Sequence, residues 1–223
     1  MKPLLITIDG PAGAGKTTVS RRLAEQLGYI YVDTGALYRA VALAAMTQGC
    51  PSDDDEGLAE VLARLTLRYE NHEKGPRLFL NGDDITEHIR TPEITMLASA
   101  VSAMRVVREY LLEVQREMGK LGRAVFEGRD MGTVVFPDAD VKFFLDADLD
   151  TRALRRFKEL AAKESLNDVS KVREAMKRRD ENDSSRALAP LKPAADAIKI
   201  DSTYLTVDEV VEVMLQVIRA IKN

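Results

Sequence analysis

The chain has 223 residues, of which 45% are hydrophobic and 30% charged, so one large domain, or a domain with insertions, can bury a sizeable core. Its net charge of −4 argues against a general nucleic-acid-binding protein. A single cysteine, Cys50, excludes an intramolecular disulfide and a cysteine-rich zinc site, and the apolar runs are too short to cross a bilayer. We therefore expect a soluble cytoplasmic protein without a nucleic-acid or membrane partner.

The first predicted element is a short buried strand over residues 4–8, followed by Gly10-Pro-Ala-Gly-Ala-Gly-Lys16-Thr17. That spacing is typical of a phosphate-binding loop between a strand and a helix. Its glycines permit the positive φ angles at which backbone N–H groups converge, and the following helix adds its positive dipole end. The loop predicts a nucleoside triphosphate site, in which Lys16 bridges the β and γ phosphates and the Thr17 hydroxyl binds Mg²⁺.

Four further apolar segments are predicted to be strands, and helical patterns separate them. The strands are expected over residues 30–33, 124–127, 141–145 and 197–201. Alternation of strands and helices predicts a parallel sheet covered on both faces, with ligands at the carboxyl ends of its strands. Acidic residues stand at or directly after these ends, and Glu127 is a candidate for indirect contact with Mg²⁺.

The stretch from about residue 62 to 90 departs from this rhythm. Residues 65–69 and 77–80 alternate apolar with polar side chains, and the Asn81-Gly82 pair is a strong turn signal. We expect a small antiparallel insert here. Helices are expected beyond it, within about 92–119, over 151–163 and 169–183, and after a capping box at Thr206-Val-Asp-Glu209.

Basic residues gather in a few places along the chain. Residues 151–192 contain twelve Lys and Arg against seven Asp and Glu, and single arginines follow two of the predicted strands at Arg39 and Arg129. A lone arginine is usually solvated, but arginines brought from several strand and helix ends toward a phosphate loop match phosphate oxygens. A phosphate acceptor chiefly needs its charge neutralised, whereas a hydroxyl acceptor needs a carboxylate base. The residues therefore favour phosphoryl transfer to a nucleoside monophosphate.

At this point the sequence resembles the bacterial cytidylate kinase family. The resemblance rests on the phosphate loop and on the strings Asp33-Thr-Gly-Ala-Leu-Tyr-Arg39, Val107-Arg108-Glu109, Gly128-Arg-Asp-Met-Gly-Thr-Val-Val-Phe-Pro137 and Arg186-Ala-Leu-Ala-Pro190. It implies ATP-dependent phosphorylation of CMP or dCMP with Mg²⁺, giving ADP and CDP or dCDP. It also implies an α/β P-loop three-layer fold with a central parallel five-stranded sheet, a small antiparallel insert and a helical lid.

The resemblance further implies a single nucleoside monophosphate kinase domain over residues 1–223. Its core would comprise about 1–60, 91–150 and 187–223, its monophosphate-binding insert about 61–90 and its lid about 151–186. ATP would be held by the residues of the loop, which are Gly10, Pro11, Ala12, Gly13, Ala14, Gly15, Lys16, Thr17 and Thr18.

Carried over position by position, the resemblance also implies an acceptor site. Arg39, Arg129 and Arg186 would hold the CMP phosphate. The cytosine edge would be read by Ser99, Arg108 and Asp130, and the ribose hydroxyls would meet Arg179 and Asp183, with Asp33 and Thr34 completing the substrate-binding set. The catalytic set would be Lys16, Arg129 and Arg186, with Arg152 and Arg156 of the lid reaching the transferring phosphoryl group.

Two alternatives stay open at this stage. One is a kinase for another small acceptor, and the other is a nucleotide-dependent switch or ATPase. A guanine-reading Asn-Lys-x-Asp string and the Leu-Ser-Gly-Gly-Gln string of transporter ATPases are both missing. The expected partners are small molecules only, namely ATP, CMP and dCMP, and the expected oligomeric state is a monomer.

Overall fold

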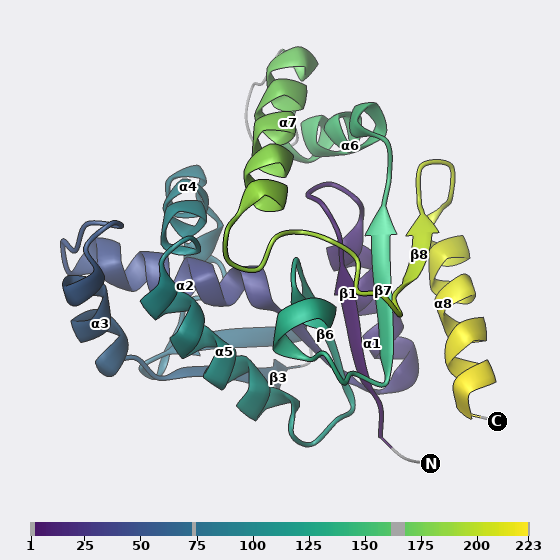
Figure 1. Ribbon diagram of the computed structural model, residues 1–223, viewed down its shortest axis with the longest axis horizontal. Helices are drawn as coiled ribbons and strands as arrows, with labels where there is room; N and C mark the ends of the chain where they lie inside the picture. Colours follow the sequence, from purple (N-terminus) through teal and green to yellow (C-terminus); the bar gives the residue numbers. More distant parts are fainter. Residues whose placement is uncertain (1–2, 73–74, 162–167, 223) are drawn as a thin grey trace. The chain divides into compact units, whose positions relative to one another are not determined.

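The structure, a computed structural model, describes residues 3–72, 75–161 and 168–222 (Figure 1). The chain divides into two compact units. The first comprises Met1–Tyr29 with Arg123–Asn223, and the second comprises Ile30–Gly122. No helix among the described residues combines the length and the apolar character needed to span a membrane.

The central sheet has five parallel strands in the order β2-β6-β1-β7-β8, which confirms the predicted fold class. These strands are β1 (Leu5–Asp9), β2 (Ile30–Asp33), β6 (Ala124–Gly128), β7 (Val141–Asp146) and β8 (Ile198–Asp201). Asp9 at the end of β1 pairs with Gly128 on one side and Phe144 on the other. The register therefore brings the ends of β1 and β6 to one edge, where ligands of such sheets bind.

Apolar side chains of β1 and β6 form the middle of the first unit. Ile6, Ile8, Val125 and Phe126 are fully buried, as expected for parallel strands covered on both faces. Helices α1 (Lys16–Leu27) and α8 (Val207–Lys222) pack against each other beside this sheet. The predicted capping box at the start of α8 is present, because the Thr206 N–H donates to Glu209 Oε2 (2.8 Å) and Thr206 Oγ1 accepts from the Glu209 N–H (3.3 Å).

Two helices, α6 (Leu149–Ala161) and α7 (Val169–Ser185), follow β7 at its carboxyl end (Figure 1). They share a small apolar cluster of Ala153, Val172 and Met176, which packs on Ala12 of the glycine loop. These helices fall in the segment where the resemblance implies a lid, and that role remains a prediction. The part of the segment at residues 162–167 lies outside the described residues.

The second unit is built around its own apolar core. Its helices are α2 (Thr34–Thr47), α3 (Asp55–Ala63), α4 (Pro92–Val101) and α5 (Arg105–Gly119), and its sheet comprises β3 (Leu67–His72), β4 (Gly75–Leu80) and β5 (Asp83–Asp84). The three short strands are antiparallel and ordered β3-β4-β5, as the insert prediction requires. Asn81 and Gly82 both have positive φ (51° and 98°) at the turn that the sequence signalled.

Candidate active site

The glycine loop runs from the end of β1 to the first turn of α1. Gly13 and Gly15 have φ of 76° and 90°, and Gly10 has φ of 147°. A Cβ at Gly10 would lie 1.9 Å from the Leu145 carbonyl oxygen, so only glycine fits this close approach of two backbones. The loop therefore presents backbone N–H groups at the start of a helix, the arrangement that favours a phosphate anion.

Lys16 is the first residue of α1 and is 6% exposed. Its Nζ donates to the Pro11 carbonyl oxygen at 2.7 Å, so the side chain folds back over the loop. Burial, followed by the positive charge of Arg129, lowers the pKa of Lys16 to about 7. A bound polyphosphate would oppose both effects, because its negative charge favours the ammonium form.

Thr17 has a partner suited to a metal site. Its Oγ1 donates to Glu127 Oε1 at 2.8 Å, and Glu127 is the buried penultimate residue of β6. A hydroxyl and a carboxylate are hard oxygen ligands, and Mg²⁺ at such sites takes its remaining ligands from phosphates and water. These two residues therefore fit the metal-binding role predicted for Thr17 and the indirect role predicted for Glu127.

Three of the predicted arginines meet at one carboxylate. Asp183, near the end of α7, is 2% exposed and accepts from Arg129 Nε (3.1 Å) and from Arg186 Nη2 (2.5 Å). Arg179 Nε lies 3.9 Å from the same carboxylate. Arg186 lies just beyond the end of α7 at Ser185, and it still contacts Asp183. The cluster thus holds three guanidinium groups around one negative charge, which leaves it positive for an incoming anion.

This arginine cluster acts on the glycine loop. Arg129 and Arg179 both contribute, after burial, to lowering the pKa of Lys16. Electrostatic interactions of this kind decay steeply with distance in protein and water. Arg129 and Arg179 of the cluster therefore act electrostatically on the lysine of the loop, and all three residues belong to the first unit, as expected for a site that binds two anions.

The arginines of α6 have different surroundings. Arg152 is 6% exposed and donates to the Ala147 carbonyl (2.8 Å), to the Ala12 carbonyl of the loop (3.2 Å) and to Asp180 of α7 (2.7 Å). Arg156 instead forms a partly exposed ion pair with Glu159 at 3.0 Å. Arg152 thus binds the loop backbone directly, and contact of either residue with the transferring phosphoryl group remains a prediction.

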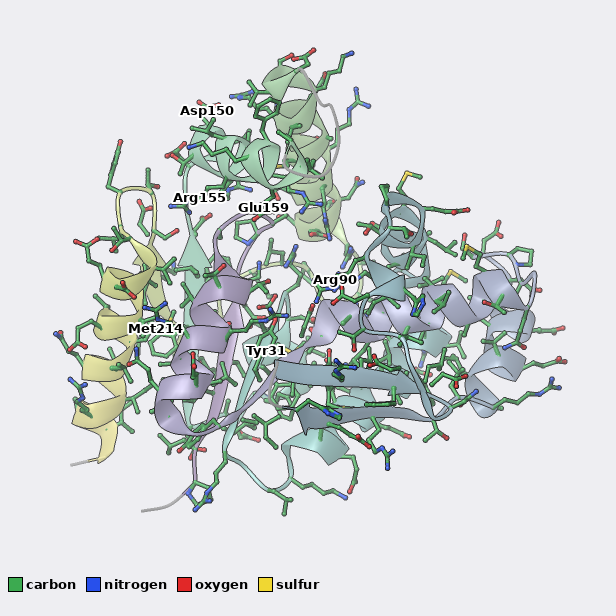
Figure 2. All side chains as sticks on the ribbon, turned by 180° about the vertical axis from the view of Figure 1, so that it is seen from behind. Tyr31, Arg90, Asp150, Arg155, Glu159 and Met214 are labelled. Carbon is green, nitrogen blue, oxygen red and sulfur yellow. The ribbon has the colours of Figure 1, made fainter. Side chains whose placement is uncertain are left out.

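Sequence reasoning assigned no role to a second connection between α6 and the loop. Ser202, directly after β8, donates through Oγ to the Ala14 carbonyl (3.1 Å). Arg155 donates to the Ser202 hydroxyl (3.1 Å) and to its carbonyl (2.6 Å). Figure 2 labels Arg155 together with Asp150 and Glu159 of the same helix. In the sequence, the feature that could have pointed to this connection is the polar string Asp201-Ser-Thr203 at the end of the last predicted strand.

Of the remaining predicted site residues, Asp130 follows Arg129 in the first unit and is 4% exposed, and the others belong to the second unit. Asp33 Oδ1 accepts from the Ala36 N–H (3.1 Å) as the cap of α2, and Oδ2 accepts from Arg39 Nη2 (2.8 Å). Asp33 therefore orients Arg39, and the adjoining Thr34 is buried. The Arg108 guanidinium lies 5.9 Å from the Tyr38 ring centroid.

Ser99 is exposed on α4, the helix that precedes the one carrying Arg108. Its carbonyl accepts a hydrogen bond from the Ser102 hydroxyl at 2.8 Å, and Arg108 Nη1 donates to the Ser102 carbonyl at 3.3 Å. Ser102 therefore contacts both residues that were predicted to read the base.

Comparison with known proteins gives a consistent family. The family model described as Cytidylate kinase matches residues 6–220. A curated cytidylate kinase of Geobacter sulfurreducens is 49% identical over 216 residues, which cover 97% of this chain and 93% of the relative. One of Syntrophotalea carbinolica is 49% identical over 217 residues, covering 97% and 92%. The crystal structure of a shikimate kinase from Bacteroides thetaiotaomicron superposes with a TM-score of 0.50 at 13% identity over 97% and 98% of the two chains, a likeness of fold.

Proposed function

The chain belongs to the cytidylate kinase family, and we propose that it transfers the γ-phosphoryl group of ATP to CMP or dCMP, giving ADP and CDP or dCDP. The observation that carries this function is the arginine cluster around Asp183, whose charges reach Lys16 of the glycine loop. A kinase for a phosphate acceptor needs this pairing of two anion-binding groups, whereas a switch or an ATPase binds only one polyphosphate.

The chemistry follows from the charges of the two substrates. The loop N–H groups and Lys16 would hold the β and γ phosphates, and the arginines would neutralise the acceptor phosphate so that its oxygen can approach the γ-phosphorus. Mg²⁺, the cation that we propose beside Thr17 and Glu127, would neutralise charge on the transferring group. Because the transition state is loose in most accounts, positioning and charge stabilisation supply most of the catalysis.

For the acceptor we propose the full set implied by the resemblance. Arg39, Arg129 and Arg186 would bind the phosphate, Arg179 and Asp183 would contact the ribose hydroxyls, and Asp33 and Thr34 would complete the substrate-binding set. Base reading by Asp130 is supported by its burial (4% exposed), since a desolvated carboxylate is a selective acceptor for the cytosine amine. Ser99 and Arg108 would complete the base contacts from the second unit.

We also propose that α6 and α7 close over the bound nucleotides and exclude water, which competes as an acceptor. In that closed form, Arg152 and Arg156 would reach the transferring group. We further propose a monomeric enzyme in the cytoplasm, where its small soluble nucleotide substrates would be found.

The function is tested by measuring ADP release from ATP and Mg²⁺ with a panel of acceptors. We expect CMP and dCMP to give the highest kcat/KM, and other monophosphates and hydroxyl acceptors to give much lower values. ADP release that does not depend on the acceptor would favour the ATPase alternative. Selective turnover of a sugar or a purine monophosphate would favour a different kinase.

Replacing Asp130 by alanine should weaken discrimination between CMP and UMP. The cytosine amine needs an acceptor, which the carboxylate supplies, whereas the uracil carbonyl at that position is repelled by it. We expect the ratio of kcat/KM for CMP to that for UMP to fall about tenfold or more, the effect of one hydrogen bond to a charged group. Asp138→Ala, an exposed acid nearby in the chain, is the control that should leave the ratio unchanged. An unchanged ratio in Asp130→Ala would remove this residue from base reading.

A further inference from the structure

The last residue of β1, Asp9, joins two parts of the first unit that are far apart in the sequence. It is 3% exposed, and its two carboxylate oxygens accept from the N–H groups of Met131 (2.9 Å) and Gly132 (2.8 Å). Asp9 directly precedes the glycine loop, and Met131 directly follows Arg129-Asp130. One carboxylate therefore connects the backbone of the proposed ATP-binding loop with the turn that carries two proposed acceptor-binding residues.

The turn that Asp9 binds is an unusual one. Met131–Val135 form a π-helix, a rare form that often lies at functional sites. Its first N–H groups have no partners inside the helix, and the side chain of the N-cap residue Asp130 does not cap it. The Asp9 carboxylate takes that place, so the cap comes from the neighbouring strand and the Asp130 side chain is not used for capping.

Packing fixes the same turn from the other side. A Cβ added to Gly132 would lie 3.2 Å from both Thr7 Oγ1 on β1 and Lys142 Cδ on β7. The backbone at Gly132 thus lies close against both strands. Because this contact and the two hydrogen bonds act on neighbouring residues, the direction in which Asp130 and Arg129 leave the turn depends on Asp9.

Burying the Asp9 carboxylate costs free energy, so packing alone does not explain an acidic residue at this position. Burial and, to a smaller extent, the nearby charge of Asp130 raise the pKa of its carboxyl to about 6, against the lowering effect of the two N–H hydrogen bonds. Burial of a carboxylate is costly, and the N–H bonds offset only part of that cost. The position therefore keeps a charged acceptor where an apolar residue would fill space without that penalty.

We propose that Asp9 is a positioning residue for the transfer reaction, which aligns Arg129 and Asp130 with Lys16 by holding the backbone of Met131 and Gly132. This inference rests on the proposed function of the site. It predicts that Asp9 affects binding of the acceptor CMP, although Asp9 directly precedes the loop that is proposed to bind the donor ATP.

The test compares Asp9→Asn with wild type. Asparagine has nearly the same shape, but its amide group offers one acceptor oxygen and opposes the second N–H with a donor. We expect KM for CMP to rise about tenfold while KM for ATP changes less than about twofold, because one charge-assisted hydrogen bond to the acceptor turn is lost. The ratio of kcat/KM for CMP to that for UMP should fall as well. This ratio does not depend on the fraction of folded enzyme, so it remains informative for a less stable variant.

Asp140→Asn is the matched control, because the Asp140 carboxylate likewise accepts from a backbone N–H, that of Leu5 (2.8 Å), which lies at the opposite end of β1 from Asp9. It should leave both KM values and the CMP to UMP ratio unchanged, even where it lowers Tm as much as Asp9→Asn does. In the double variant Asp9→Asn/Asp130→Ala the two effects on the ratio should not add, since both would act through the Asp130 carboxylate.

Two results would overturn the inference. One is an Asp9→Asn enzyme with wild-type KM for CMP and a wild-type ratio. The other is an equal rise of both KM values that follows the loss in Tm, as expected for a purely structural residue. Failure of the wild-type protein to phosphorylate CMP would instead overturn the proposed function, and the inference with it.

Discussion

Replacing Lys16 by alanine is expected to lower kcat about a thousandfold or more, because charge stabilisation at the transferring phosphoryl group contributes most of the rate enhancement in such reactions. Lys16 lies over the loop, with its Nζ 2.7 Å from the Pro11 carbonyl, on the segment that is proposed to hold the phosphates. KM for ATP should rise less than kcat falls, since the loop N–H groups remain. Steady-state ADP release at saturating ATP and CMP measures this effect. Near-normal turnover would contradict it.

The stability of a Lys16→Met variant separates catalysis from folding. The pKa of Lys16 falls from 10.5 to about 7 on folding, so the unfolded chain binds more protons between these pH values. Stability of the wild type should therefore rise with pH across that window, and the neutral methionine should abolish this dependence. At pH 7 to 8 the variant should be no less stable than wild type, so its loss of turnover cannot be ascribed to unfolding.

A second buried lysine offers a matched control. Lys142 on β7 is 7% exposed and donates to the Pro137 carbonyl and to Asp196 (2.7 Å), on the segment that leads into β8. Lys142→Met removes a buried ammonium that has no phosphate role in the proposed mechanism. The variant should have a lower Tm, but because methionine keeps an unbranched side chain beside Gly132, its kcat should stay close to wild type. Equal losses of kcat in both lysine variants would show that charge at Lys16 has no special role.

The fold was predictable because its signals are local. The apolar runs at 4–8 and 124–127 are buried parallel strands whose composition alone distinguishes them from the amphipathic helices. Asn81-Gly82 specifies its hairpin through the positive φ that both residues adopt. Gly10 likewise signals a close backbone approach, although the partner, the Leu145 carbonyl, could not be read from the sequence.

The contacts that organise the site were not predictable, because they join residues that are distant in the chain. Asp9 and Gly132 are separated by 123 positions, and Ser202 and Ala14 by 188. The polar side chains of Asp9 and Ser202 also suit surface turns, and no spacing rule connects them to these distant backbone groups. The sequence showed arginines in the right segments, but only the structure shows that Asp183 gathers Arg129 and Arg186.

Replacing Asp183 by alanine should raise KM for CMP about a hundredfold, with a smaller rise in KM for ATP. The carboxylate holds Arg129 and Arg186, whose side chains are only 20% and 17% exposed, so its loss leaves two partly buried cations to repel each other. Removing one partner of a buried ion pair costs about 3 kcal/mol or more. We expect much of this cost to appear as weaker CMP binding, because the guanidinium groups would no longer be held in the arrangement that the acceptor phosphate requires.

Asp183 can either orient the arginines for the acceptor phosphate or compete with that phosphate for them. Asp183→Asn distinguishes these two roles. If the carboxylate mainly orients the arginines, asparagine should recover part of the CMP affinity, because its oxygen still accepts from one guanidinium. If the carboxylate mainly competes with the phosphate for the arginines, both variants should bind CMP more tightly than wild type. We expect the first result, since three arginines around one carboxylate leave enough positive charge for a phosphate monoester of about −2. Asp150→Ala, which removes only the exposed ion pair between α6 and Arg173 of α7, controls for disturbance of these helices and should leave KM for CMP unchanged.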